Sequence, residues 1–331
     1  MTDINTIVVS SRVRLARNLE GLPFKTKKGA AYEAVAETIK AKNKGYGSVR
    51  IADFGDNPIV KALYEQHLIS KELIANKANG IIVAKNDNKV VVMLGEEDHI
   101  RIQAITTGFG LKRIHEEAKK IADDIALAHP VAFRPDLGYL TSCPTNLGTA
   151  MRASVMMFLP ALTLEGVMEA ITEELAEQRI TVRGVYGEGS TASGLMYQIS
   201  NQACLGLSEQ EILEMVESAA LSIAKREFMV QARLAKERPD EIADQVFRAW
   251  GILTNALMMS SAEAVSHLSL LKLGACLGII AFKNVRILDD LFFVIQPNTL
   301  AVQDNRASSV ITRDKIRAAR IAEILHASRI K

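Results

Sequence analysis

The sequence predicts an α+β protein in which strands come first and a group of helices follows. Short runs of β-branched or alternating polar and apolar residues, typical of strands, recur from the N-terminus to about Cys204. Beyond about Lys236 these runs fade until Val294, and apolar residues recur at helical spacing instead. We therefore expect two domains: residues 1–235, which contain the strands, and an all-helical domain over residues 236–331.

Length and composition are those of an ordinary globular protein. The chain has 331 residues, 48% of them hydrophobic and 24% charged, which suits two domains or one large core with an appended module. Its 40 basic residues are nearly balanced by 38 acidic ones, leaving a net charge of +2. Bulk attraction to nucleic acid or to a membrane is therefore not indicated, and basic residues matter only where they gather locally.

Cysteine usage and the N-terminus predict a cytoplasmic protein. The three cysteines are widely spaced, odd in number and without a CxxC pair, which favours a reducing compartment and argues against a zinc site. The start, MTDINTIVV, lacks the basic region and apolar core of a signal peptide. No run of about twenty apolar residues occurs, so we expect no membrane span.

The first domain is predicted to alternate short strands with amphipathic helices. The strands are expected at residues 4–9, 81–84, 90–94, 99–104, 154–159, 180–185 and 197–204. An Asn-Asp-Asn turn at residues 86–88 joins the second and third of these into a hairpin. A capping box from Ser208 to Glu211 opens a long helix. The other helices are expected at residues 29–40, 57–69, 110–128 (with His115 at its surface) and 165–178.

The C-terminal domain is predicted from helix start signals. A second capping box, Ser260 to Glu263, starts a helix-rich stretch that continues through residues 268–280. Thr312 is expected to cap the last helix. On that helix one face carries arginines and another is apolar; the two sets are Arg313, Arg317 and Arg320, and Ala318, Ile321 and Leu325.

Arginines lie before or within predicted strands. Arg12 and Arg14 share one face of an extended segment, because side chains alternate with period two. Arg101 lies on the polar face of the strand at 99–104, and Arg152 and Arg183 lie beside two later strands. Each alone suits a solvated basic edge equally well. Together they would form a cradle for a polyphosphate, since arginine is always charged and can grip phosphate with two hydrogen bonds.

A cysteine and two glutamates complete a candidate site. Cys143 lies in a turn-rich loop next to Pro144, where it is either a small buried apolar residue or a thiolate stabilised by nearby positive charge. Glu97 precedes the strand with Arg101, and Glu188 lies in a glycine-rich loop. No P-loop and no HRD or DFG kinase motif is present. This inventory suits transfer of a phosphoryl group to a cation whose nitrogen must be oriented and deprotonated.

Four separated motifs in order carry a resemblance to a known family. SSRVRLARNL, GEEDHIRIQ, LGYLTSCPTNLGTAMRAS and RGVYGEGS, followed by YQISNQ, resemble the phosphagen (guanidino) kinases, most of all their bacterial branch of protein-arginine kinases. The similarity runs from about Ile7 to Val230. It implies an antiparallel β-sheet flanked by helices, and transfer of the γ-phosphate of ATP to a guanidinium nitrogen.

The resemblance also implies roles for individual residues. Glu97 and Glu188 would clamp the acceptor guanidinium and accept its proton, with Cys143 beside them. Mg²⁺ would be bound through the nucleotide, because the sequence has no dedicated cluster of metal ligands. The positions that match the nucleotide site are Ser10, Ser11, Arg12, Val13, Arg14, His67, Arg101, Arg152, Ala153, Ser154, Val155, Met156, Arg183, Gly184, Val185, Tyr186, Gly187 and Glu188.

Two features favour the protein-arginine branch. Small-guanidine kinases carry a helical domain before their first arginine motif, whereas eleven residues precede Arg12 here. The tail contains RDKIRA, which matches the RDxxRA motif, an allosteric phosphoarginine-binding element of that branch. The motif residues are Arg313, Asp314, Arg317 and Ala318.

The resemblance implies protein substrates marked for quality control or degradation, as in a stress response. A homodimer formed through the helical tail, an activator protein and a protease chaperone are further expected partners. Membranes and nucleic acids are not expected partners. The alternatives are a kinase of free arginine or another small guanidine, and a catalytically idle adaptor that binds phosphoarginine.

Overall fold

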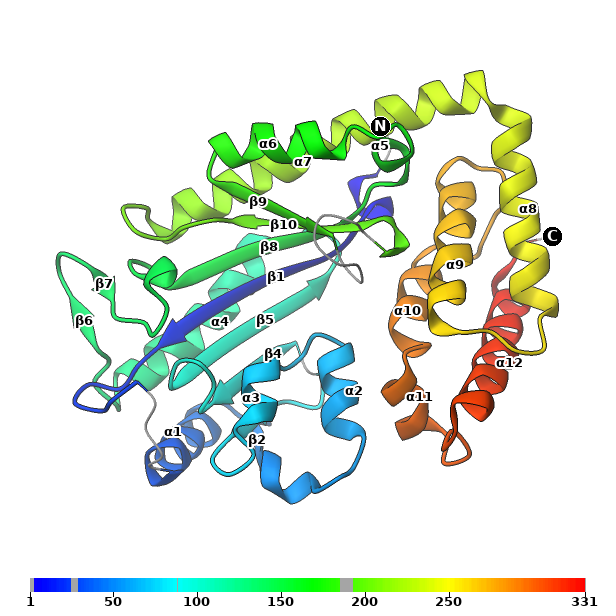
Figure 1. The fold of residues 1–331 in the computed structure, drawn as a ribbon. Coiled ribbons are helices and arrows are strands. Elements are labelled where there is room, and N and C mark those ends of the chain that lie inside the picture. The colour runs from blue at the N-terminus through cyan, green and yellow to red at the C-terminus, as the bar shows by residue number, and fades with distance from the viewer. Residues whose placement is uncertain (1–2, 25–28, 88, 185–192, 331) are drawn as a thin grey trace.

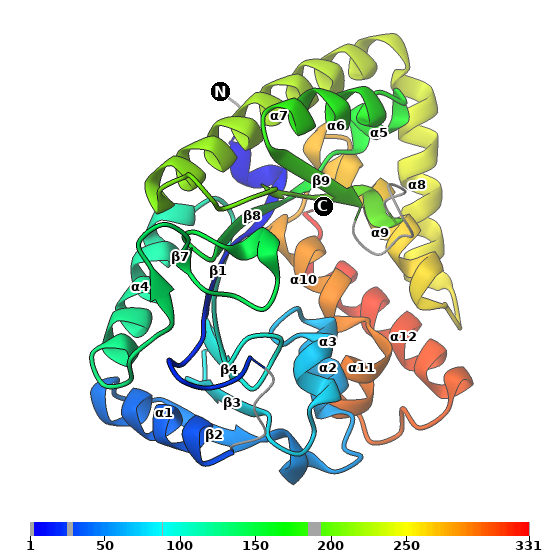
Figure 2. The same ribbon diagram turned by 60° about the vertical axis from the view of Figure 1, so that its left-hand side comes forward.

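The computed structural model describes residues 3–24, 29–87, 89–184 and 193–330. Over these residues the chain forms a broad twisted sheet, with helices on its faces and a group of helices at one end (Figures 1 and 2). This confirms the predicted α+β class and the antiparallel sheet flanked by helices.

The sheet has eight antiparallel strands in the order β2-β3-β4-β5-β1-β8-β10-β9. Its centre is the longest strand, which pairs on both sides and runs diagonally through Figure 1. The bounds are β1 Val8–Arg17, β2 Gly47–Arg50, β3 Ile81–Ala84, β4 Val90–Leu94, β5 Ile100–Thr107, β8 Met151–Phe158, β9 Ile180–Gly184 and β10 Met196–Asn201. A small separate hairpin consists of β6 Phe133–Arg134 and β7 Gly138–Tyr139.

One face of the sheet is apolar and is covered by helices. Val13 and Leu15 of β1 and Ile102 of β5 belong to this face, and all three are completely buried. Four helices pack against it and fill the main core: α1 Gly29–Lys42, α4 Leu111–Ala126, α6 Met168–Glu177 and α7 Glu209–Glu237. The opposite face therefore remains free for the polar residues that alternate with these apolar ones.

The helices after α7 build a second core that is continuous with one end of the sheet. They are α8 Pro239–Asn255, α9 Ser261–Cys276, α10 Arg286–Val294, α11 Pro297–Gln303 and α12 Val310–Ser328. Their apolar residues pack together with Phe158 of β8 and Met196 of β10. Gly274 allows α9 to lie close to α8, because a Cβ at this position would collide with Val246. The helical part is thus anchored on the sheet.

Three short helices complete the fold. They are α2 Ile59–Glu65, α3 Lys71–Ala75 and α5 Pro160–Leu164. Around α2 and α3 a third apolar cluster forms against β3 and β4, on the side of the sheet away from α4. Among the helices of the described segments, none has the length together with the apolar character that crossing a bilayer requires.

Several predicted boundaries were wrong for local reasons. Residues 4–6 form a 3₁₀ helix capped by Asp3 rather than the start of a strand. The last helix is capped by Ser309, whose hydroxyl accepts from the backbone N–H of Thr312. The helix predicted over residues 57–69 ends at Glu65, and His67 lies in the following turn with φ 58°.

Three further predictions about the helices had different outcomes. His115 is not a surface residue: its Nε2 lies 2.9 Å from Oε2 of Glu209, so it packs between α4 and α7. The region 160–178 holds α5 and α6, separated at Gly166 with φ 71°. The capping box at Ser208 is confirmed, with both reciprocal hydrogen bonds to Glu211.

Candidate active site

The polar face of the central strands gathers the arginines. Cross-strand pairing places Arg14 opposite Arg152 of β8 and Gln103 of β5, and places Arg12 opposite Ser154. Directly paired residues project to the same side of a sheet. Arg101 pairs with Ala16, two residues beyond Arg14 on β1, and so joins the same face. Four of the five predicted arginines therefore lie together.

These arginines carry more positive charge than their surroundings balance. Burial, then Arg101 and Arg152, lower the pKa of Arg12 to about 10. Burial and the same neighbours also lower the pKa of Arg14. The carboxylate of Glu96, whose side chain is 2% exposed, pairs with Arg101. A buried cluster of like charges favours a polyanion, which would remove the repulsion.

Some guanidinium donors of the cluster are already hydrogen-bonded within the protein, and two are not. An Nη2–H of Arg12 donates to Oε1 of Gln198 at 2.6 Å, and Nη2–H of Arg152 donates to Oγ of Ser200 at 3.1 Å. The Nε atoms of Arg14 and Arg152 are buried, and neither has a hydrogen-bond partner among the described residues. Because buried donors are nearly always satisfied, these two point to a bound anion.

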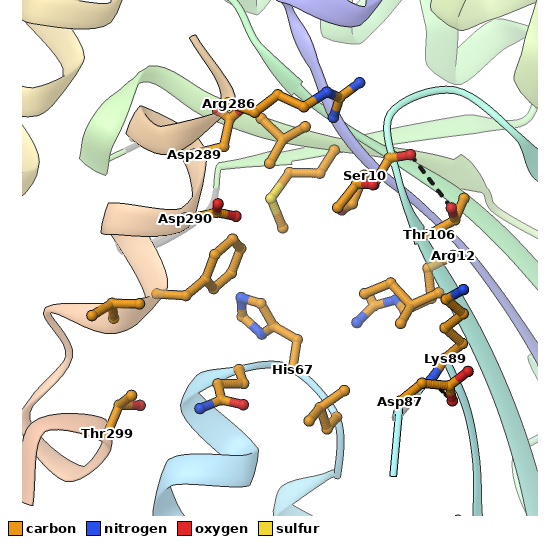
Figure 3. Close-up of a pocket in the computed structure, with 18 of the residues that line it drawn as sticks. Ser10, Arg12, His67, Asp87, Lys89, Thr106, Arg286, Asp289, Asp290 and Thr299 are labelled. Carbon is orange, nitrogen blue, oxygen red and sulfur yellow. Dashed lines mark hydrogen bonds between the residues drawn. The ribbon is translucent and has the colours of Figure 1, made fainter. Parts of the chain in front are cut away.

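A cavity of about 940 Å³ opens over this face. The sheet contributes Ser10, Arg12 and Gln198, and the opposite wall comes from α10, including Asp290. Figure 3 shows Arg12 and Lys89 on one side of the cavity, Asp290 on the other, and His67 between them. The volume lies at the upper end of the range for cofactor and ligand sites.

His67 forms part of the cavity wall as a neutral ring. Burial, and then the charge of Arg12, lower its pKa to about 4. The ring meets Phe293 of α10 edge to face, with centroids 5.9 Å apart. Nε2–H of Gln103 donates to the carbonyls of His67, at 2.8 Å, and of Leu68, at 3.2 Å. A neutral ring beside an aromatic ring suits a flat apolar ligand group such as a nucleobase.

The loops that carry Glu97 and Cys143 are tied together at the end of the arginine cluster. The buried carboxylate of Asp98 accepts from Nδ2–H of Asn18 and from the backbone N–H of Ser142, both at 2.7 Å. Oγ–H of Ser142 donates to the carbonyl of Glu97 at 2.9 Å. Sequence-distant loops are thereby fixed side by side.

Glu97 and Cys143 have different polar surroundings. Burial, followed by the negative charges of Asp98 and Glu96, raises the pKa of Glu97, and a raised pKa makes a carboxylate a stronger base. Sγ of Cys143 lies 3.0 Å from Oγ1 of Thr145. Cys143 lies near Arg152, among the groups that act on that guanidinium.

The structure places the other predicted residues unevenly. Val13, Ala153 and Val155 are buried in the core on the opposite face. Ser11 is also buried, and its hydroxyl donates to the carbonyl of Gly108 and accepts from N–H of Gly110. Arg183 lies exposed on β9 opposite Gln198, near enough to lower the pKa of Arg152. The predicted residues Val185, Tyr186, Gly187 and Glu188 lie outside the described residues.

Comparison with known proteins gives the family. Residues 30–230 match the profile described as "ATP:guanido phosphotransferase, C-terminal catalytic domain". Residues 239–331 match "Protein-arginine kinase McsB C-terminal domain". The chain belongs to the protein-arginine kinase family. It therefore carries a guanidino phosphotransferase fold joined to the helical region specific to that family.

Relatives agree over nearly the whole chain. A protein-arginine kinase of Clostridium kluyveri is 38% identical over 96% of this chain and 94% of its own. One of Bacillus subtilis is 39% identical over 97% of this chain and 90% of its own.

Among solved structures, the duplicated taurocyamine kinase of Schistosoma mansoni covers 74% of this chain and 38% of its own, with TM-score 0.61 and 26% identity. A lombricine kinase has TM-score 0.60 over 72% of this chain and 70% of its own, and at 23% identity it supports the fold alone.

The RDxxRA motif lies on α12 with its two arginines in different surroundings. Arg317 is 1% exposed, and its guanidinium donates to the carbonyls of Ile295, at 2.8 Å, and Met259, at 2.7 Å, and pairs with Asp314. Ala318 is buried in the second core. Arg313 is half-buried and remains accessible. Arg317 thus holds α12 to α10 and to the start of α9, whatever else the motif does.

Sequence reasoning missed three kinds of site residue. Glu96 pairs with Arg101, although only its neighbour Glu97 was predicted; both lie in the loop between β4 and β5, where strand alternation does not apply. Gln198 binds Arg12 and falls within the motif YQISNQ. The wall formed by α10, including Phe293, has no local signal, because its place depends on how the helical region packs on the sheet.

Proposed function

We propose that this chain transfers the γ-phosphate of ATP to guanidinium nitrogens of arginine side chains in proteins. The observation that carries this proposal is the cluster of Arg12, Arg14, Arg101 and Arg152, with buried unpaired donors, beside the Glu97 and Cys143 loops. Such a cluster aligns and neutralises a polyphosphate, and that is most of what phosphoryl transfer requires.

In this proposal the nucleotide spans the cavity. The four arginines hold the phosphates, and Arg183 contacts them from β9. Ser10, Ser154, Met156 and Gln198 line the cavity on the side of the sheet, and His67 contacts the nucleobase. Mg²⁺ bound to the phosphates would supply further charge neutralisation; the described residues contain no cluster of metal ligands, so the nucleotide would hold it.

The acceptor guanidinium enters from the side of Glu97. A guanidinium is a weak nucleophile with pKa above about 12, so carboxylates must orient it and take its proton. Glu97 does so from its loop, Glu188 is the second carboxylate of the clamp, and Cys143 lies beside the acceptor. The N–P bond forms, the bond from phosphorus to the β,γ-bridging oxygen breaks, ADP leaves, and the nitrogen's proton passes to the carboxylate.

The direct test is phosphorylation with γ-labelled ATP and Mg²⁺ of an unfolded arginine-containing protein or of free arginine. We expect acid-labile label, as in a phosphoramidate, on the protein. Glu97→Gln should lower the rate on the order of a hundredfold, whereas Glu116→Gln, an exposed acid on α4, is the control that should not. Label on free arginine alone would indicate a small-guanidine kinase, and none on either would favour the adaptor.

We also propose that the RDxxRA motif binds phosphoarginine. The accessible Arg313 would contact the phosphate and Asp314 the guanidinium, while Arg317 and Ala318 hold the helix in place. Arg313→Ala should then lose phosphoarginine binding without loss of stability.

For partners we propose a homodimer, an activator protein and a protease chaperone, acting in cytoplasmic quality control. The three cysteines are free, which fits a reducing compartment. Apolar side chains exposed where the loop after α8 meets the start of α12 would suit the dimer contact. This C-terminal apolar patch consists of Leu257, Met258, Val310 and Ile311.

A further inference from the structure

One carboxylate joins the helical region to the loop that carries His67. Glu65, the last residue of α2, accepts from the backbone N–H of Asn298 at 3.0 Å and of Thr299 at 2.8 Å. It also accepts from Nδ2–H of Asn298, at 2.6 Å, and from the hydroxyl of Thr299, at 3.1 Å. Thr299 is 1% exposed and Glu65 is half-buried, so the contact is partly shielded from water. Charge-assisted hydrogen bonds to a carboxylate are among the stronger polar contacts in proteins.

The contact lies directly beside the proposed nucleotide pocket. Gln66 and His67 follow Glu65 in sequence and line the cavity, and so does Thr299. Helix α10, which precedes α11 by two residues, supplies the facing wall. In Figure 3 Thr299 and Asp290 lie at the end of the cavity away from Arg12 and Lys89, and His67 lies between the two ends. Glu65 therefore fixes the two sides of this end relative to each other.

The two walls meet at an aromatic contact. Phe293 of α10 touches the ring of His67 edge to face, and His67 has the uncommon φ of 58°. On β5, Gln103 donates from its side-chain amide to the carbonyls of His67 and Leu68 in this loop. Gln103 thus fixes the loop to the sheet, and Glu65 fixes α11 to the loop, with α10 joined to α11 through two residues. The phosphate end, by contrast, is built from strands β1, β5 and β8.

We propose that the C-terminal helices complete the nucleobase end of the ATP site, with Phe293 as its wall and Glu65 as the residue that positions that wall. This rests on the proposed function, because the cavity must take ATP. It predicts that affinity for the base and affinity for the phosphates can be separated. Glu65 is a positioning residue: it acts on the ligand through Phe293 and His67.

The test compares two probes on the full chain by calorimetry: ATP, and inorganic tripolyphosphate, which has no base. Glu65→Ala should weaken ATP binding about tenfold, which is what loss of one aromatic contact of typical strength gives. Tripolyphosphate binding should stay within about twofold, because the arginine cluster is unchanged. In kinetics the KM for ATP should rise while kcat changes little.

Two further variants keep the test decisive. Phe293→Leu, which preserves an apolar side chain, should weaken ATP and spare tripolyphosphate in the same way, even if Glu65→Ala proves too unstable to measure. Glu211→Ala removes a glutamate that likewise accepts from a backbone N–H, in the capping box of α7, and should change neither affinity.

The outcomes separate the two proposals. Equal weakening of both probes by Glu65→Ala and Phe293→Leu, or no weakening of either, would overturn the positioning role while leaving ATP as the ligand. A wild-type chain that binds tripolyphosphate but not ATP would overturn the proposed function, and this inference with it.

Discussion

At the scale of single residues, the site combines groups that are costly to bury. Arg12 and Arg14 lie side by side on one strand with lowered pKa values, and His67 is held neutral beside them. Both effects have the same origin, since burial and neighbouring positive charge disfavour every cation in this region. A residue that lowers the stability of the protein without ligand and stabilises the complex with ligand is typical of a binding site.

Arg14→Met should show this trade directly. Its guanidinium has a lowered pKa, so the charged form costs the folded state free energy, and removing it should raise the melting temperature without nucleotide by roughly 2 °C or more. The same change should lower kcat/KM for ATP on the order of a hundredfold. Calorimetry with and without ATP measures both sides. Arg113→Met, an exposed arginine on α4, is the matched control, and a fall in the unliganded melting temperature of Arg14→Met would contradict the argument.

His67 predicts a pH dependence of stability. Its folded pKa, about 4, lies below the ordinary 6.5, so below pH 6.5 the unfolded chain takes up a proton that the folded chain does not. The contribution of His67 is therefore complete above pH 6.5 and is lost as the pH falls toward 4. Between pH 7 and pH 5 the wild type should lose up to about 2 kcal/mol more than His67→Gln. Urea unfolding at the two values measures the difference; equal losses would show that His67 titrates normally.

At the scale of elements, alternation along the strands decides which residues can react. On β1, Arg12 and Arg14 face the cavity while Val13 and Leu15 face the main core, and a shift of register by one residue would exchange them. The bulge between Val8 and Ser10 adjusts this register near one end of the strand. Helices are joined by a different device, a buried ion pair between Lys272 of α9 and Asp289 of α10.

Breaking that ion pair on one side should be severe. Lys272 is 0% exposed, with its ammonium also 4.6 Å from the centre of the Phe158 ring, so Asp289→Asn leaves a buried charge without its counter-charge. We expect a loss of about 3–5 kcal/mol in the free energy of unfolding. The double variant Lys272→Met with Asp289→Leu should recover most of it. Chemical denaturation of the single and double variants measures the coupling, and additive losses would disprove it.

At the scale of the whole molecule, the two main cores are not separate. Phe158 and Met196, at one end of the sheet, pack into the core of the C-terminal helices. Glu65, the last residue of α2, binds α11 through Thr299. Arg317 of the RDxxRA motif binds the end of α10 through the carbonyl of Ile295. The cavity therefore lies where the sheet and the helical region meet, and changes in the helical region should alter the shape of the cavity.

The exposed C-terminal apolar patch gives a prediction about assembly. Leu257 is 88% exposed and Ile311 60% exposed, and exposed apolar residues that gather in one patch mark an interaction site, whereas a single one does not. If the homodimer forms through the patch, Leu257→Glu with Ile311→Glu should give a monomer by light scattering. Leu127→Glu, at the end of α4 and with Leu127 81% exposed, should leave the dimer intact. Dissociation by Leu127→Glu as well, or by neither change, would place the contact elsewhere.

Much of this protein was determined by the sequence alone. Period-two alternation put Arg12, Arg14 and Arg101 on one face of their strands, and the capping box at Ser208 fixed the start of α7, because these are local rules of backbone geometry. The short motifs around Glu97 and Cys143 predicted the chemistry that the family match bears out. Local sequence also misled at Ile4 and Thr312, where the nearby residues Asp3 and Ser309 act as helix caps.

Only the tertiary structure decided which groups meet. The neutral state of His67 and the buried role of Arg317 depend on long-range packing that no spacing reveals. The wall of the cavity formed by α10 and held by Glu65 lies more than two hundred residues from Arg12 in the chain. Alternation and capping act between near neighbours, whereas electrostatics and enclosure depend on distance in space.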